Sequence, residues 1–165
     1  MLTKRAILLM SLFFLIGCFV IGCAPKEPLP PSWTFKTSFV NHSPTIGNTD
    51  APIKIEVFSD FACKHCKKGS EIAKELLLEY PGQVYVVYKH MLLRTEGKSM
   101  NAAKAARAAS VQDRFWDMHD AIYKYGRKLS KSEVYHLASL LGLEMTLFNE
   151  AVSYTHLTLP TTPYV

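Results

Sequence analysis

Two short apolar runs with an amphipathic stretch between them predict the centre of the fold. Residues 53–58 and 84–88 are rich in β-branched and aromatic side chains, which is typical of strands. Between them, apolar residues over 66–80 recur at the spacing of one helix face, and Pro81 with Gly82 ends that pattern. A strand, a helix and a second strand of these lengths predict a βαβ unit whose two strands are parallel.

The chain after this unit has helical patterns throughout. Residues 99–111 are rich in alanine, which allows helices to pack closely, and residues 113–125 carry apolar side chains three and four positions apart. Ser130 and Glu133 form a capping box in front of a third helix, and residues 144–152 predict a short fourth one. The predicted class is therefore α/β, with a βαβ core joined to a helical region.

The first residues have the pattern of an export signal. Lys4 and Arg5 precede an apolar run over 6–21, which is shorter than the roughly 20 residues that a membrane span needs. The run ends in Val20-Ile21-Gly22-Cys23, which resembles a bacterial lipoprotein signal, in which the cysteine is acylated after cleavage. We expect a signal peptide over 1–22 and a lipid anchor at Cys23. The expected location is the bacterial cell envelope, in the periplasm or at the outer face of the membrane.

Two other interpretations of this segment stay open. A second match to the signal ends at Cys18, although cleavage there would leave the apolar residues 19–21 exposed. The segment could also be an uncleaved anchor, in which Cys18 and Cys23 are simply apolar side chains.

Residues 23–45 are predicted to join this signal to the domain. The proline-rich part, 24–32, predicts an extended spacer, and residues 33–40 alternate between apolar and polar like a peripheral strand. Residues 41–52 contain proline, glycine and asparagine and predict a loop.

The candidate chemistry lies where the first strand of the βαβ unit turns into the helix, at Cys63-Lys64-His65-Cys66. This position places Cys63 at the helix N-terminus, where unpaired amides and the macrodipole favour a thiolate. Cys66 follows one turn later, and Lys64 and His65 add positive charge and possible hydrogen-bond donors. Two thiols at this spacing can close a disulfide and exchange it with other thiols.

Three other uses of this motif were weighed against thiol exchange. A zinc site would need two more ligands, but Cys18 and Cys23 lie in the signal and the sequence has no second pair. Haem attachment needs histidine after the second cysteine, where Lys67 stands. A structural disulfide is possible, but a bridge around two residues constrains the unfolded chain little. We therefore expect redox exchange, with no metal and no cofactor.

The charge of the chain does not point to nucleic acid. The formal net charge of +5 falls by two, to +3, when Lys4 and Arg5 leave with the signal. The remaining lysines and arginines are mixed with acidic residues on helix faces, which is the pattern of a solvated surface.

Other polar residues near the motif have simpler interpretations. Glu56 and Asp60 could relay protons to Cys66, but a strand-edge or loop carboxylate is the favoured interpretation. His119 is expected to form hydrogen bonds at the rim of the core, and His90 and His136 are expected at the surface.

Several segments besides the paired cysteines share the pattern of one known family. They are Ile46-Gly47-Asn48-Thr49-Asp50-Ala51-Pro52, Phe58-Ser59-Asp60-Phe61, Ala106 to Ala109, Gln112 to Asp120, and Leu141-Gly142-Leu143. Together they resemble the DsbA-like family of thioredoxin-fold thiol:disulfide oxidoreductases, over about Ile46 to Val152. The resemblance implies a thioredoxin core with an inserted helical subdomain, here residues 98–152.

The resemblance also implies a role for each residue of the motif. Cys63 is the nucleophile that exchanges with substrate, Cys66 is the resolving cysteine, and His65 stabilises the Cys63 thiolate. Lys64 departs from the proline that the family often has there, so the redox potential of the pair does not follow from the resemblance.

The end of the chain departs further from the family. The family continues with a loop that bears a cis-proline, a two-stranded hairpin and a final helix, and this sequence has no room for them. We expect a partial domain over 46–152 and a tail over 153–165 that lies outside the domain and resembles translated adapter sequence. Thr162-Pro163 comes too soon to be the family's loop. Without the hairpin, strand 53–58 would have an open edge, which favours aggregation.

The sequence therefore predicts an exported thiol:disulfide oxidoreductase. An oxidase is favoured because His65 and the helix N-terminus both stabilise a thiolate. The expected partners are substrate proteins with cysteine thiols, a membrane or soluble redox partner that resets the cysteines, and membrane lipid. A thiol reductase or isomerase, a non-catalytic lipoprotein and an inactive fragment stay open as alternatives.

Overall fold

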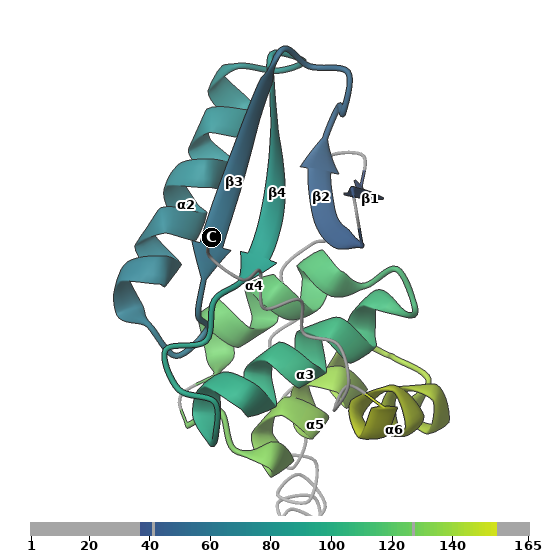
Figure 1. Cartoon of the computed structure of the whole chain (residues 1–165). Helices are drawn as coiled ribbons and strands as arrows, with labels where there is room; N and C mark the ends of the chain where they lie inside the picture. Colours follow the sequence, from purple (N-terminus) through teal and green to yellow (C-terminus); the bar gives the residue numbers. More distant parts are fainter. Residues whose placement is uncertain (1–36, 41, 127, 155–165) are drawn as a thin grey trace, which may run out of the picture.

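The computed structural model describes residues 37–40, 42–126 and 128–154 (Figure 1). The signal segment, Cys23, the proline-rich linker and Thr162-Pro163 lie outside the described residues. Within them, the fold is α/β: a four-stranded sheet with helix α2 along it, and a group of helices beyond one end of the sheet. The predicted fold class is confirmed.

The sheet has the strand order β1-β2-β4-β3. Strand β4 pairs with β3 in parallel and with β2 in antiparallel orientation, and β2 pairs with β1 in antiparallel orientation. The strands are β1 (Thr37–Val40), β2 (Ser43–Gly47), β3 (Ile53–Ser59) and β4 (Val84–His90). Strand β3 is thus at one edge, and among the described residues no strand pairs with its other side.

The predicted βαβ unit is confirmed as β3, α2 (Lys64–Glu79) and β4. The parallel register runs from Ile53 opposite Val84 to Ser59 opposite His90. Both strands end where the group of helices begins, and α2 starts at the same end (Figure 1). The carboxyl ends of the two parallel strands therefore meet the start of α2, and the paired cysteines lie at this junction.

The prediction of a loop over 41–52 was wrong, because β2 lies inside that range. All five residues of β2 are buried, since the strand lies between β1 and β4. The turn-forming residues concealed it: Pro44 lies within the strand and Gly47 ends it with a positive φ of 102°. A side chain at Gly47 would come within 3.0 Å of the Val84 carbonyl oxygen, so the glycine allows close approach between strands here.

The four helices after β4 confirm the predicted helical region. They are α3 (Lys98–Ser110), α4 (Phe115–Tyr125), α5 (Lys131–Leu140) and α6 (Met145–Tyr154). Helix α3 packs against the other three, and its six alanines are fully buried, which lets the helix axes approach closely. The Oγ of Ser130 accepts the amide hydrogen of Glu133, 3.2 Å away, as expected of the capping residue of α5.

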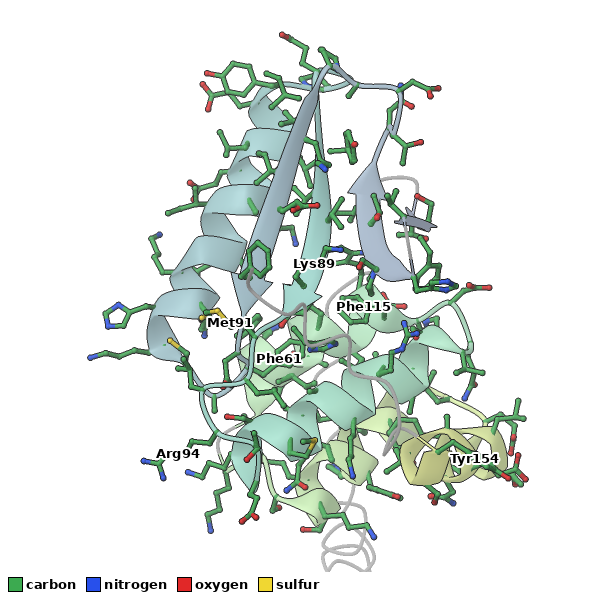
Figure 2. All side chains as sticks on the ribbon, in the orientation of Figure 1. Phe61, Lys89, Met91, Arg94, Phe115 and Tyr154 are labelled. Atoms are coloured by element: carbon green, nitrogen blue, oxygen red, sulfur yellow. The ribbon has the colours of Figure 1, made fainter. Side chains whose placement is uncertain are left out.

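An aromatic cluster fills the junction between the strand ends and the helices. Figure 2 shows Phe61 and Phe115 together at this place. The ring of Tyr88 lies between them, with its centroid 5.5 Å from that of Phe61 and 5.2 Å from that of Phe115. The buried ring of His119 has its centroid 5.6 Å from that of Phe61. The helices thus cover the end of the sheet through aromatic rings rather than through backbone pairing.

The expectation that His90 lies at the surface was wrong. Alternation along β4 places His90 on the same face as Val86 and Tyr88, and both of its ring nitrogens are buried without a hydrogen-bond partner among the described residues. The pKa of His90 is lowered to about 4, mainly by burial and in smaller part by the charge of Arg107. His136 is exposed on α5, as expected.

In the described part of the chain, no helix combines the length and the apolar character that crossing a membrane requires.

The buried His90 predicts a loss of stability in acid. The unfolded chain binds a proton at this ring below about pH 6.5, but the folded protein does so only near pH 4, so the free energy of unfolding falls between these values, by up to about 3 kcal/mol. His90→Phe should remove this part of the pH dependence. Urea unfolding of both proteins at pH 7, 5.5 and 4 measures it; parallel curves for the two proteins would contradict the assignment.

Candidate active site

The loop before α2 is held by the buried carboxylate of Asp60. Its Oδ1 accepts the amide hydrogen of Ala62 at 2.7 Å, and its Oδ2 accepts that of Leu93, also at 2.7 Å, in the loop after β4. Asp60 is 1% exposed. A buried carboxylate is tolerated when such charge-assisted hydrogen bonds replace water. Asp60 is therefore a loop carboxylate, as expected, and it joins the two loops beside the cysteines.

Cys63 is the N-cap residue of α2, which confirms its predicted place at the helix N-terminus. Its backbone is extended, with φ −94° and ψ 119°, and no side chain caps the helix. The first turn of α2 contains no acidic residue, so the first amides of the helix are left to the thiol of Cys63. Cys63 and Cys66 are both free thiols and both partly exposed.

The surroundings lower the pKa of Cys63. The backbone N–H of Cys66 has the largest effect, the thiol of Cys66 adds a second hydrogen bond, and the backbone N–H of His65 adds a third. Burial and the negative charge of Asp60 act in the opposite direction. The thiolate of Cys63 is thus stabilised mainly by donors of its own motif.

The surroundings raise the pKa of Cys66. Burial is the largest cause, and the interaction with the sulfur of Cys63 adds to it, while the backbone N–H of Asp60 and the hydroxyl of Ser59 oppose it. Two thiols three residues apart therefore have shifts of opposite sign. Cys63 is therefore the better thiolate, and the more buried Cys66 holds its proton more tightly.

Ser59 connects Cys66 to the helical region. Its hydroxyl lies 2.8 Å from the phenol oxygen of Tyr123 on α4, and Ser59 itself is 1% exposed. Burial raises the pKa of Tyr123 to about 12, so the phenol is neutral at ordinary pH and can donate a hydrogen bond to Ser59. The Ser59 hydroxyl is then free to donate to the Cys66 sulfur.

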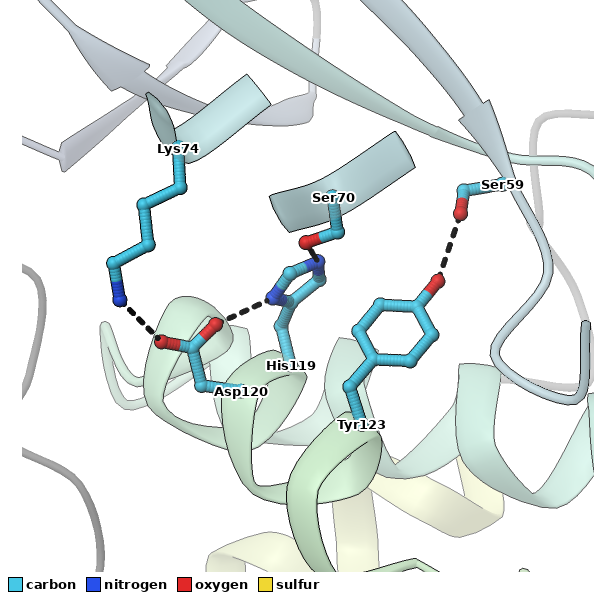
Figure 3. A network of polar contacts seen from close by, with 6 residues as sticks. All are labelled: Ser59, Ser70, Lys74, His119, Asp120 and Tyr123. Atoms are coloured by element: carbon cyan, nitrogen blue, oxygen red, sulfur yellow. Dashed lines mark hydrogen bonds and ion pairs between the residues drawn. The ribbon is translucent and has the colours of Figure 1, made fainter. Parts of the chain in front are cut away.

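A second polar contact joins α2 to α4 one turn farther along (Figure 3). The Oγ of Ser70 lies 3.2 Å from Nε2 of His119, and Nδ1 of His119 lies 3.0 Å from a carboxylate oxygen of Asp120. The other oxygen of Asp120 pairs with the ammonium of Lys74 at 3.5 Å. Burial lowers the pKa of His119, and the carboxylate of Asp120 opposes this. His119 is therefore a hydrogen-bonded core residue, as expected.

The remaining predicted site residues lie at the surface. Lys64 and His65 lie in the first turn of α2 and are exposed. Of these two residues, His65 alone lowers the pKa of Cys63, and it does so through its backbone N–H. Glu56 is on the outer face of the edge strand β3 and pairs with Lys54 at 3.2 Å.

Sequence reasoning missed Ser59 and Tyr123 as neighbours of the resolving cysteine. They lie 64 positions apart, and nothing in either local pattern signals the contact.

The two thiols should titrate separately. The rate of alkylation of each cysteine against pH, followed by mass spectrometry, should show a lower pKa for Cys63 than for Cys66, because of the hydrogen bonds to Cys63 and the burial of Cys66. Ser59→Ala should raise the pKa of Cys66 further, since it removes a donor. Ser110→Ala, a buried hydroxyl on α3, is the matched control and should change neither value. A Cys66 that ionises before Cys63 would contradict the described geometry.

Comparison with known proteins agrees with this fold. A sequence model of the family described as thioredoxin matches residues 40–158. A solved thioredoxin-like oxidoreductase from Silicibacter pomeroyi DSS-3 superimposes with a TM-score of 0.61 at 23% identity, over 69% of this chain and 65% of that one. The thiol-disulfide exchange protein alpha-DsbA2 from Wolbachia pipientis superimposes with a TM-score of 0.59 at 22% identity, over 68% of this chain and 60% of that one.

A curated relative of a different kind also matches part of the chain. The Na(+)/H(+) antiporter NhaA 3 of Salinispora tropica is 31% identical over 105 residues, which are 63% of this chain and 16% of the antiporter. This chain thus spans about a sixth of the antiporter and less than two thirds of either solved structure. The structural matches confirm the predicted DsbA-like fold, and the family match shows that the chain belongs to the thioredoxin family.

Proposed function

We propose that the protein is a thiol:disulfide oxidoreductase that works as a DsbA-like oxidase through Cys63 and Cys66. The observation that carries this proposal is the opposite direction of the two pKa shifts, lowered at Cys63 and raised at Cys66. The similarity to a thiol-disulfide exchange protein and to a thioredoxin-like oxidoreductase supports it.

In the proposed oxidation, the active form carries a Cys63–Cys66 disulfide. A substrate thiolate attacks the sulfur of Cys63, the bond between Cys63 and Cys66 breaks, and Cys66 leaves and takes up a proton. A second substrate thiolate then attacks the substrate sulfur of this mixed disulfide and releases Cys63 as a thiolate. The substrate loses two electrons and two protons and gains a disulfide, while the pair of cysteines is reduced.

Each pKa shift suits one part of this sequence. A lowered pKa makes Cys63 a good leaving group in the second step and stabilises the reduced protein, which makes its disulfide more oxidising. The raised pKa of Cys66 favours protonation of the released thiol, which slows its return to Cys63. Some mixed disulfides are not attacked by a second substrate thiolate. When Cys66 ionises, it attacks Cys63 in these and releases the substrate.

The flanking residues have supporting roles in the proposal. His65 acts on the Cys63 thiolate through its backbone N–H, and the ammonium of Lys64 adds positive charge to the first turn of α2. The effect of Lys64 would weaken at high salt, since its side chain is exposed.

The proposed setting is the bacterial cell envelope. The apolar run ending at Cys23 supports export and a lipid anchor at that cysteine. Disulfides form and persist outside the cytoplasm, which suits an oxidase there. Its partners would be substrate proteins with cysteine thiols and a redox partner that reoxidises Cys63 and Cys66.

Trapping tests the division of work between the cysteines. Cys66→Ser should accumulate a mixed disulfide between Cys63 and a disulfide-containing substrate, because no resolving thiol remains. Cys63→Ser is the matched control and should accumulate none. Non-reducing electrophoresis with mass spectrometry identifies the adduct. A Cys66→Ser protein that forms no adduct would contradict catalysis at this site.

The reduction potential separates an oxidase from a reductase. Equilibration of the Cys63–Cys66 pair with glutathione should give a value towards about −120 mV, since the lowered pKa of Cys63 stabilises the reduced form. A value near about −270 mV, as in thioredoxin, would reject the oxidase and favour a reductase.

A further inference from the structure

A cleft of about 250 Å³ lies between α2 and α4, and its lining begins at Lys67, the residue after Cys66. Its α2 wall consists of Lys67, Ser70, Glu71 and Lys74, and its α4 wall consists of Asp120, Tyr123 and Lys124. Figure 3 shows the side chains of Ser70 and Lys74 pointing towards α4 in this region. The contacts of Ser70 with His119 and of Lys74 with Asp120 join the two helices here, so the cleft lies where the βαβ unit meets the helical region.

The cleft follows the face of α2 that starts at Cys63. Lys67, Ser70 and Lys74 lie four, seven and eleven positions after Cys63, and residues at these spacings stack on one side of a helix. The nearest wall residue, Lys67, is therefore one turn from the exchanging sulfur. A polypeptide joined to Cys63 can continue along α2 directly into the cleft.

The lining of the cleft holds three lysines and two carboxylates, so basic groups outnumber acidic ones. Its two carboxylates are already paired: Glu71 with Lys68 at 3.4 Å, and Asp120 with Lys74 at 3.5 Å. Lys67 has no carboxylate within 4 Å among the described residues and is exposed. On the opposite wall, the ammonium of Lys124 lies 4.8 Å from the ring centroid of Tyr125, a contact that keeps its positive charge.

We propose that this cleft receives an acidic segment of the substrate polypeptide whose cysteine is exchanging with Cys63. The inference rests on the proposed function, because it assigns the specificity of the same site. Lys67 and Lys124 approach the segment from two walls, and the aliphatic lysine stems and the ring of Tyr123 contact its non-polar parts. The first turn of α2, which has no acidic residue, extends the positive region to Cys63 itself.

Positive charge in the cleft acts mainly on the rate of encounter with a substrate and on the preference between substrates. A positively charged cleft raises the local concentration of anionic partners and repels cationic ones, and salt weakens both effects. The proposal therefore predicts a ratio of rates between substrates of opposite charge rather than an absolute rate.

The experiment uses the reduced full-length protein and three peptides of equal length. Each peptide carries one cysteine in a disulfide with 2-mercaptoethanol, flanked on both sides by two aspartates, two serines or two lysines. The second-order rate of exchange is followed at pH 7 at low ionic strength and in 0.5 M NaCl. We expect the aspartate peptide to react about tenfold faster than the lysine peptide at low salt, and only about twofold faster at high salt.

Substitutions separate the cleft from the general charge of the protein. Lys67→Gln combined with Lys124→Gln should reduce the low-salt ratio to about threefold, and Lys67→Arg should keep it near tenfold. Lys131→Gln on α5 removes one positive charge, matches Lys67→Gln alone in net charge, and should leave the ratio unchanged. Glu71→Gln should raise the ratio, because it removes negative charge from the wall.

The outcomes distinguish failure of the cleft as a site for acidic segments from failure of the proposed function. Equal rates for the three peptides, or a ratio that the double variant leaves unchanged, would overturn the cleft as a site for acidic segments. So would an equal effect of Lys131→Gln. A protein that exchanges with none of the peptides, the serine peptide included, would instead overturn the proposed function. An unfolded chain also exposes reactive thiols, so the urea unfolding curve of each variant, together with Lys67→Arg, separates loss of charge from loss of folding.

Discussion

The active-site loop depends on one buried charge, the carboxylate of Asp60. Its two oxygens accept amide hydrogens from Ala62, in the loop before α2, and from Leu93, in the loop after β4. Because β3 and β4 are parallel, these loops leave the same end of the sheet, and the carboxylate joins them. The position of Cys63 at the start of α2 follows from this arrangement, since the backbone N–H of Cys63 bonds the Asp60 carbonyl oxygen at 3.1 Å.

The contacts within the helical region differ in kind from those between this region and the βαβ unit. Within the helical region, the buried alanines of α3 bring the helices close, and a few side-chain hydrogen bonds, such as that of Asn101 to the Leu129 carbonyl, add to this packing. At the junction with α4, the contacts are polar: Ser59 at the end of β3 with Tyr123, and from α2 Ser70 with His119 and Lys74 with Asp120 (Figure 3). Polar groups at this junction leave room for a cleft and place a hydroxyl beside Cys66. The helical region therefore shapes the surroundings of the resolving cysteine as well as covering the sheet.

The motif acquires its asymmetry from small differences in surroundings. Cys63 lies at the helix N-terminus and receives hydrogen bonds from the motif itself, whereas Cys66 lies one turn further along the helix and is less accessible to water. Hydrogen bonds to a thiolate and removal of water from it shift the pKa in opposite directions. A single turn of helix is enough to separate an exchanging thiol from a resolving one.

The sequence alone determined the parts of this protein that depend on local patterns. Spacing and capping residues specify several elements within a few positions. They are the strand, helix and strand of the βαβ unit, the four later helices, the cap at Ser130 and the place of Cys63 at a helix N-terminus.

Tertiary structure alone decided the rest. Strand β2 was hidden by Pro44 and Gly47 and exists because β1 and β4 pair with it. The burial of His90, the contact of Ser59 with Tyr123 and the cleft between α2 and α4 join residues far apart in the chain, and the motif Cys63-Lys64-His65-Cys66 carries no local signal of them. The paired cysteines were thus evident from the sequence, whereas the groups that make them different come from the packing of α4 against the βαβ unit.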